Sequence, residues 1–167
     1  MKNFPQLFVL GILGIFLLSS CQEDEEPIDN SSQVIGHWRN SHDLDDNIQM
    51  ISYYSFLENG NFNSSSVYIN SDSDELLGYS GRSSGTYSLL DDQLSIQTTI
   101  VYSVPESSDT PYVPTIQLVQ SSQNFSSEKT VEFNENQDKM TWIYPPCGPL
   151  ENCIGSQVFE RFTPIEF

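Results

Sequence analysis

Cys21 is the residue whose position most clearly indicates chemistry, because its thiol directly follows an apolar segment near the N-terminus. Lys2 provides a positive charge ahead of residues 7–18, a run of twelve residues without a charged side chain. This run is too short to cross a bilayer, which takes about 20 apolar residues, and its pattern is typical of a secretory signal. We therefore expect residues 1–20 to be a signal peptide.

The residues that end this segment, Leu18-Ser19-Ser20-Cys21, resemble the lipobox of bacterial lipoproteins. The resemblance implies that the signal is cut before Cys21 and that Cys21 then carries acyl chains of the palmitate type, which anchor the protein in a bilayer. A single chain anchors only marginally, since each buried methylene contributes about 0.8 kcal/mol, so a lipoprotein cysteine carries several. The alternatives are an uncleaved signal anchor and an ordinary secretory signal with an incidental cysteine.

The segment after Cys21 is polar and acidic. Gln22 and the acidic residues 23–26 resemble the export signal of surface-exposed lipoproteins in one Gram-negative phylum. The resemblance implies an outer-membrane location facing the cell exterior, with the periplasmic face as the alternative. Residues 21–32 cannot bury enough apolar surface to fold, so we expect an acidic flexible tether, followed by a single domain over residues 33–167.

The chain from Cys21 onward is strongly anionic. It contains all 23 acidic residues and five of the six basic ones, for a formal net charge of −18. Binding to nucleic acid requires clustered lysine and arginine. The basic residues here are instead scattered along the chain: Arg39, Arg82, Lys129, Lys139 and Arg161. We therefore exclude nucleic acid as a partner, expect membrane contact through the acyl chains alone, and expect a monomer.

Cys147 and Cys153 are an even pair of thiols in a chain that we expect to be exported, where disulfides persist. The residues between them include Gly148 and Pro149, as in a short loop that joins two antiparallel strands. We expect a disulfide across this loop. A zinc site is the weaker alternative, because no histidine or second cysteine pair lies nearby to complete four ligands.

No combination of residues in the sequence predicts catalysis. His37 and His42 are the only histidines, and neither lies in a pattern that indicates a nucleophile and its base. We expect no catalytic residue, no cofactor and no enzymatic activity.

Two acidic segments carry the alternating oxygen ligands that calcium prefers. The candidate ligands are Asp43, Asp45, Asn47, Asp72 and Asp74. The first segment departs from an EF-hand loop, because Ile48 stands where the turn glycine belongs and Tyr54 where the last glutamate belongs. Acidic loops are usually only solvated, so we predict no metal site and keep calcium as the weaker alternative.

The elements that must position these residues are β-strands. The period of a half-buried strand is seen where Ser95, Gln97, Thr99, Val101 and Ser103 alternate with Leu94, Ile96, Thr98, Ile100 and Tyr102. Asn59-Gly60 and Asp91-Asp92 are hairpin signals. Strands are expected over residues 33–39, 51–57, 62–69, 85–90, 94–102, 113–120, 128–133, 139–144 and 157–163, and longer loops over 71–78 and 104–114. This succession predicts an all-β fold of about eight strands, either an antiparallel up-and-down barrel or a sandwich.

Gly36-His37-Trp38 resembles the Gly-x-Trp start of lipocalins and of lipocalin-like bacterial lipoproteins, which are β-barrels of the calycin type. Further pieces follow in the family's order: residues 54–62, 85–96 and 159–162. The resemblance favours the barrel and implies that Gly36, Trp38 and Arg161 close one of its ends, with Arg161 packed across the Trp38 ring. A guanidinium over an indole contributes about 0.5 to 2 kcal/mol.

The same resemblance implies that the barrel binds a small apolar or amphipathic ligand without catalysis. Tyr102 and Trp142 are the candidate lining residues, because aromatic rings line apolar pockets, although strands favour such residues in any case. The alternative function is that of a surface interaction module, which has a filled core and contacts a protein or a glycan through its loops.

Overall fold

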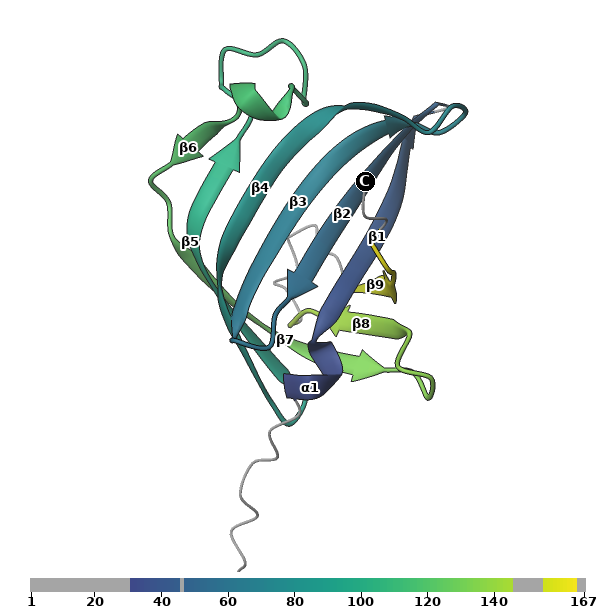
Figure 1. Cartoon of the computed structure of the whole chain (residues 1–167), viewed down its shortest axis with the longest axis vertical. Coiled ribbons are helices and arrows are strands. Elements are labelled where there is room, and N and C mark those ends of the chain that lie inside the picture. Colours follow the sequence, from purple (N-terminus) through teal and green to yellow (C-terminus); the bar gives the residue numbers. More distant parts are fainter. Residues whose placement is uncertain (1–30, 46, 146–154, 165–167) are drawn as a thin grey trace, which may run out of the picture.

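The computed structural model describes residues 31–45, 47–145 and 155–164. They form one antiparallel sheet with the strand order β4-β3-β2-β1-β9-β8-β7-β5-β6. Because β4 also pairs with β5, the sheet closes into a barrel, and β6 is an extra strand beside the upper part of β5 (Figure 1). The prediction of an all-β antiparallel barrel is confirmed.

The elements have the following bounds. A one-turn helix, α1 (Ser31–Val34), precedes the strands β1 (Gly36–Asp45), β2 (Ile48–Phe56), β3 (Asn61–Asn70), β4 (Glu75–Leu90) and β5 (Gln93–Ser103). A 3₁₀ helix, η2 (Thr115–Gln117), leads to β6 (Val119–Ser121), β7 (Phe125–Phe133), β8 (Lys139–Ile143) and β9 (Ser156–Arg161). Within the described ranges, no helix has both the length and the apolar character needed to cross a membrane.

Tight turns join neighbouring strands at the positions that the sequence predicts. Gly60 (φ 76°) lies in the turn from β2 to β3, and Asp91 (φ 54°) lies in the turn from β4 to β5. Both residues adopt the left-handed backbone that tight hairpin turns commonly use. The register of β2 and β3 sets Phe56 opposite Phe62, and both rings are buried inside the barrel.

The loop predicted over residues 71–78 is wrong. Strand β4 already begins at Glu75, and only a tight turn separates it from β3. In this turn the Asn70 side-chain oxygen accepts hydrogen bonds from the backbone N–H groups of Asp72 and Ser73. A short polar side chain that satisfies the backbone in this way makes a compact Asx turn, so no longer loop is needed.

Two predicted strand segments are wrong in part. In the segment 33–39, residues 33 and 34 belong to α1 and the strand begins at Gly36, and the segment 113–120 is mostly not a strand. Val113 makes a single β-bridge to Tyr79, and the chain then enters η2 before the short β6. Pro114 explains the break, because proline has no N–H to donate to a neighbouring strand.

The apolar core fills the end of the barrel that carries α1, at the bottom of Figure 1. Its buried residues are Val34, Trp38, Phe56, Phe62, Tyr87, Leu89, Leu94, Ile96, Val131, Met140, Trp142 and Phe159. Farther along β3 and β4 the inward positions are polar, and the Ser64 and Ser83 hydroxyls share a hydrogen bond of 2.6 Å. The barrel interior therefore has an apolar end and a polar end.

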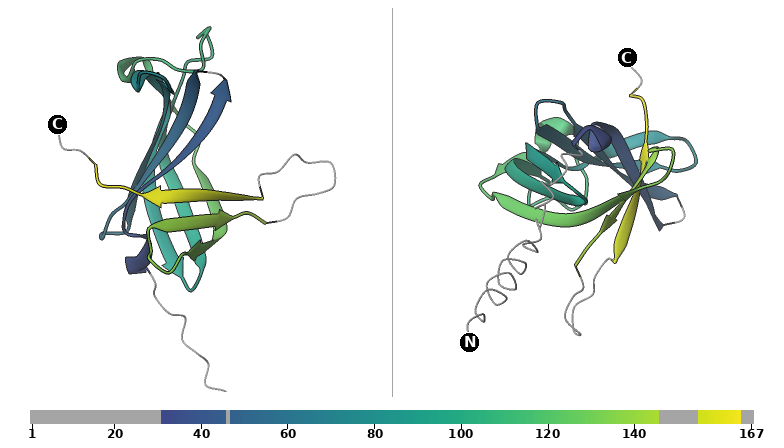
Figure 2. Two further views of the ribbon diagram at one scale, coloured as in Figure 1. Left: turned by 90° about the vertical axis from the view of Figure 1, so that its right-hand side faces the viewer. Right: turned by 90° about the horizontal axis from the view of Figure 1, so that it is seen from below.

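The joint between β1 and β9 is short. These strands are in register at two described positions, where Trp38 lies opposite Arg161 and Arg39 lies opposite Glu160. Figure 2 shows β9 crossing the direction of β1 and β2 instead of following it. Side-chain contacts near this joint therefore add to the short strand pairing in closing the barrel.

Candidate functional site

Trp38 closes the apolar end of the barrel. Its side chain is fully buried, and the indole Nε1 donates a hydrogen bond of 2.7 Å to the Val34 carbonyl at the end of α1. The Arg161 Cζ atom lies 4.3 Å from the centroid of the Trp38 ring. This arrangement joins the first and last strands of the barrel through one stacked pair.

Arg161 also binds three backbone carbonyls around this pair. Its guanidinium donates to Ile35 O at 2.8 Å, to Gln33 O at 2.9 Å and, through Nε, to Gln137 O at 2.9 Å. Gly36 makes room for it: the residue has φ 130°, and a Cβ added there would lie 2.7 Å from Arg161 Nη1. The structure thus brings together the three residues that the lipocalin resemblance singles out, in an arrangement without reactive groups.

A lysine lies inside the barrel above this closed end. Lys129 on β7 stands opposite Leu94 on β5, and its side chain is 7% exposed. Its Nζ atom is 4.0 Å from the centroid of the Trp142 ring and 5.5 Å from that of Tyr144. Nζ donates no hydrogen bond to any residue that the structure describes. The ammonium is therefore held by ring faces alone, which attract a cation but do not neutralise it.

Two tyrosines and a glutamine surround the same Trp142 ring. The Tyr54 ring on β2 packs edge-on against Trp142, with 4.8 Å between ring centroids. The Tyr144 hydroxyl donates a hydrogen bond of 2.6 Å to Gln157 Oε1 on β9. Lys129, Tyr54, Tyr144, Trp142 and Gln157 together are called the interior polar cluster below.

The polar tips of Lys129 and Tyr54 are still reached by solvent. Neither Nζ of Lys129 nor the hydroxyl of Tyr54 has a hydrogen-bond partner among the described residues. No side-chain nitrogen or oxygen of the described part of the chain is both fully buried and without a partner. It follows that these two atoms each keep some contact with solvent.

Burial shifts the titration of this cluster. It lowers the pKa of Lys129 to about 8 and raises the pKa of Tyr54 to about 12, and the nearby Tyr144 phenol adds to the Tyr54 shift. Burial also raises the pKa of Tyr144. At neutral pH the cluster therefore carries one positive charge on Lys129, while both phenols are neutral and able to donate hydrogen bonds.

Replacing Lys129 with methionine is expected to stabilise the protein by about 1 to 3 kcal/mol at pH 7, because it removes a desolvated charge and keeps the side-chain volume. The pKa of Lys129 is about 8 in the folded protein and 10.5 unperturbed. Between these two pH values the unfolded chain binds more protons than the folded protein. The free energy of unfolding of the wild type should therefore rise from pH 8 to pH 10.5, and below pH 8 the charged Lys129 should destabilise the fold to its full extent.

Urea unfolding of both proteins at pH 7 and pH 10 measures this effect. The matched control is Lys139→Met, whose lysine is 54% exposed in a surface ion pair with Glu160 and should change stability by less than about 1 kcal/mol. A Lys129→Met variant that is no more stable than the wild type at pH 7 would show that the ammonium is not desolvated.

Sequence reasoning missed Lys129 as a site residue and assigned Tyr102 to the wrong face. Lys129 and the buried Val131 are two residues apart in β7, so their side chains point to the same, inward side of the strand. This spacing is the sequence signal for an inward lysine. Trp142 does lie inside the barrel, 1% exposed, beneath the Lys129 ammonium.

Tyr102 is 39% exposed and faces outward. A β-bulge inserts Thr99 between the paired positions Thr98 and Ile100, so the side chains of β5 after Thr99 point to the opposite sides of the strand. Tyr102 and Trp142 therefore do not share a site.

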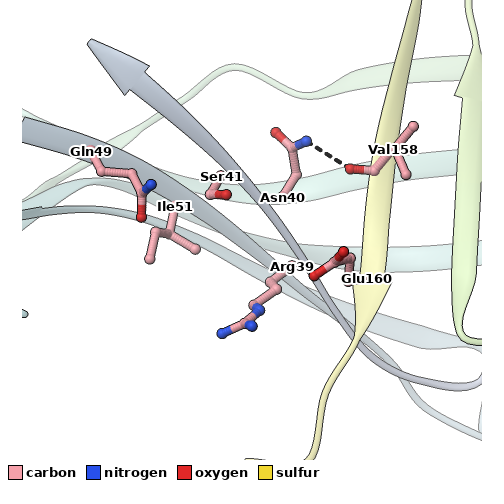
Figure 3. A pocket seen from close by; sticks show the side chains of 7 residues that line it. All are labelled: Arg39, Asn40, Ser41, Gln49, Ile51, Val158 and Glu160. Atoms are coloured by element: carbon pink, nitrogen blue, oxygen red, sulfur yellow. Dashed lines mark hydrogen bonds between the residues drawn. The ribbon is translucent and has the colours of Figure 1, made fainter. Parts of the chain in front are cut away.

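A groove of about 400 Å³ opens on the outside of the barrel where β1 and β9 diverge (Figure 3). It is lined by Arg39, Asn40, Ser41, Gln49, Ile51, Val158 and Glu160. Asn40 Nδ2 donates a hydrogen bond of 2.7 Å across the gap to Val158 O. Arg39 is exposed in this groove and forms no ion pair with any described residue, so it is available to a polar or acidic partner.

The remaining predicted site residues are placed as follows. His37 Nδ1 is 2.8 Å from the Ser55 hydroxyl, and no carboxylate of the described residues orients this pair as catalysis would require. His42 is exposed on β1. Asp43 accepts a hydrogen bond from Gln49, and the described residues contain no group of three or more side chains that could hold a metal ion.

The other calcium candidates all lie at one end of the barrel. Asp45 ends β1, Asn47 lies in the turn after it, and Asp72 and Asp74 lie in the turn between β3 and β4. Cys21, Cys147 and Cys153 fall outside the described residues. The lipid attachment and the disulfide therefore stay predictions.

Comparison with protein-family models, with curated proteins and with solved structures finds no match for this chain.

Proposed function

We propose that this chain is a lipocalin-like outer-membrane lipoprotein whose barrel binds a small amphipathic molecule without catalysis. The interior polar cluster is the observation that carries the proposal. Lys129 and Tyr54 present unpaired polar tips that solvent reaches, inside a barrel whose adjoining surface is aromatic. Ligand sites in proteins combine a mostly apolar lining with a few polar groups in this way.

The surroundings of the cluster suit the apolar part of such a molecule. Phe159 packs against Trp142 with 4.2 Å between ring centroids, and Tyr54 lies against both rings. An eight-stranded barrel is wide enough to hold one small ligand when its side chains do not fill it completely. The buried core includes Trp142 and Leu94, which lie at the level of Lys129, so we expect a ligand to extend beyond them toward the polar inward positions of β3 and β4.

Membrane anchoring is a separate part of the proposal and rests on the N-terminal sequence. The Leu18-Ser19-Ser20-Cys21 segment and the acidic residues after it support acylation at Cys21 and export to the outer membrane. A ligand-binding barrel held at a membrane surface would meet amphipathic molecules that leave or enter the bilayer.

The ligand is tested with Tyr54→Phe, which removes one unpaired hydroxyl and keeps the ring. Affinity for a fluorescent amphipathic probe is expected to fall by about threefold to tenfold, the usual effect of losing one hydrogen bond. Tyr53→Phe is the matched control, because Tyr53 faces the other side of the same strand, against Phe162. Native mass spectrometry of protein purified from cell envelopes should in addition detect a bound molecule. Absence of a bound molecule together with failure of the probe to bind would reject the proposal.

The second candidate function is a surface interaction module for a protein or a glycan. The outer groove favours it, because Arg39 is exposed there in a protein of strongly negative charge and has no partner among the described residues. This function takes first place if the barrel fails the binding test.

A further inference from the structure

Lys129 differs from every other basic residue that the structure describes. Arg39, Arg82 and Lys139 are exposed, and Arg161 donates to backbone carbonyls at the closed end. Only Lys129 among these described residues is buried without a hydrogen-bond acceptor. Buried charges in proteins are normally paired, because an unpaired one is costly, so this lysine requires an explanation.

The described part of the chain supplies no ion-pair partner for Lys129. Among the residues whose side chains are described, no aspartate or glutamate is buried, and the buried polar residues are Thr98 and Lys129. The neighbours that face the ammonium are Trp142 and Tyr144 from the β8 side, Leu94 from β5 and Tyr54 from β2, which packs on Trp142. None of them carries a negative charge at neutral pH.

The groups at this site fit an oxyanion. An ammonium supplies charge and up to three donors, and a phenol supplies one further donor. Tyr144 already donates to Gln157, whereas the Tyr54 hydroxyl and all Lys129 donors are unused among the described residues. A second cation would be repelled by Lys129, and an uncharged head group would leave its charge unpaired.

We infer that the amphipathic ligand carries an oxyanion head group, such as a carboxylate, that pairs with the Lys129 ammonium and accepts a hydrogen bond from Tyr54, while its chain lies against the aromatic rings. This inference rests on the proposed function, because it names the ligand class of the same barrel. It also gives a role to an unpaired lysine at a position where we expect methionine to be more stable.

Three probes with the same twelve-carbon chain test the head group: dodecanoate, dodecyl sulfate and dodecanol, each measured by displacement of a fluorescent amphipath. The wild type is expected to bind both anions about 10- to 100-fold more tightly than the alcohol, as hydrogen bonds to charged groups imply. Lys129→Met should remove this preference, whereas Lys129→Arg should retain most of it. Preference for dodecanoate over dodecyl sulfate identifies a carboxylate, and the reverse identifies a sulfate or phosphate head group.

The pH dependence gives an independent check. The preference for anions should decline between pH 7 and pH 9.5, since the ammonium loses its proton in this range, while Tyr54 and Tyr144 keep theirs. Lys129→Met should show no such decline. If all three probes bind the wild type equally, the head-group inference is wrong and the proposed amphipathic site stands. If no probe binds, the proposed function fails and this inference fails with it.

Discussion

Replacing Trp38 with alanine is expected to lower the free energy of unfolding by about 3 to 5 kcal/mol, comparable with the total stability of many small domains. The ring is completely buried, so its loss leaves a cavity at the closed end of the barrel. The Val34 carbonyl would also lose the indole donor, and Arg161 would lose the ring on which it stacks. Thermal and urea unfolding followed by circular dichroism measure the change.

The control for this substitution is Tyr102→Ala. Tyr102 is an aromatic strand residue of the same barrel, but it is 39% exposed on the outer face. Its removal should change stability by less than about 1 kcal/mol. A Trp38→Ala protein as stable as Tyr102→Ala would mean that the Trp38 ring does not close the barrel.

Replacing Cys21 with alanine is expected to move the protein from the membrane fraction to the soluble fraction almost completely. The chain from Cys21 onward has a formal charge of −18, which repels it from anionic lipid, so the acyl chains are its expected means of attachment. An alkyne fatty acid fed to cells should label the wild type and leave Cys21→Ala unlabelled. Fractionation and labelling together measure the effect.

Cys147→Ala is the matched control, because it removes a cysteine that we do not expect to be acylated. This variant should still be labelled and should stay with the membranes. Membrane retention of Cys21→Ala at the level of the wild type would contradict the lipoprotein proposal, whatever the barrel binds.

Local signals made much of the barrel predictable. Turn residues such as Gly60 and Asp91 specify their backbone conformation by themselves, and the alternation in β5 is visible without any knowledge of its neighbours. The sequence predicts only residues 85–90 of β4 as a strand, because the first part of β4 is rich in serine and glycine and has weak intrinsic strand preference. It is held as a strand by pairing with β3 on one side and β5 on the other, which are contacts distant in sequence.

The candidate site was harder to predict than the fold. The positions of Gly36, Trp38 and Arg161 could be expected from a family resemblance, because each belongs to a short motif. Lys129 belongs to none, and lysine is usually assigned to the surface. Whether Tyr102 points inward depends on a single bulged residue, Thr99, which no periodicity in the sequence indicates.

The short joint between β1 and β9 has a mechanical consequence. If Cys21 holds the chain to a membrane, any pull on the domain enters through Ser31 and reaches α1 and β1 first. Hydrogen bonds from Arg161 to Gln33 and Ile35 tie this entry point to the last strand, and the bond to Gln137 ties it to the turn before β8. Arg161 therefore resists separation of the first strand from the last at the point where tension enters the domain. A pulling force would be shared among β1, β8 and β9.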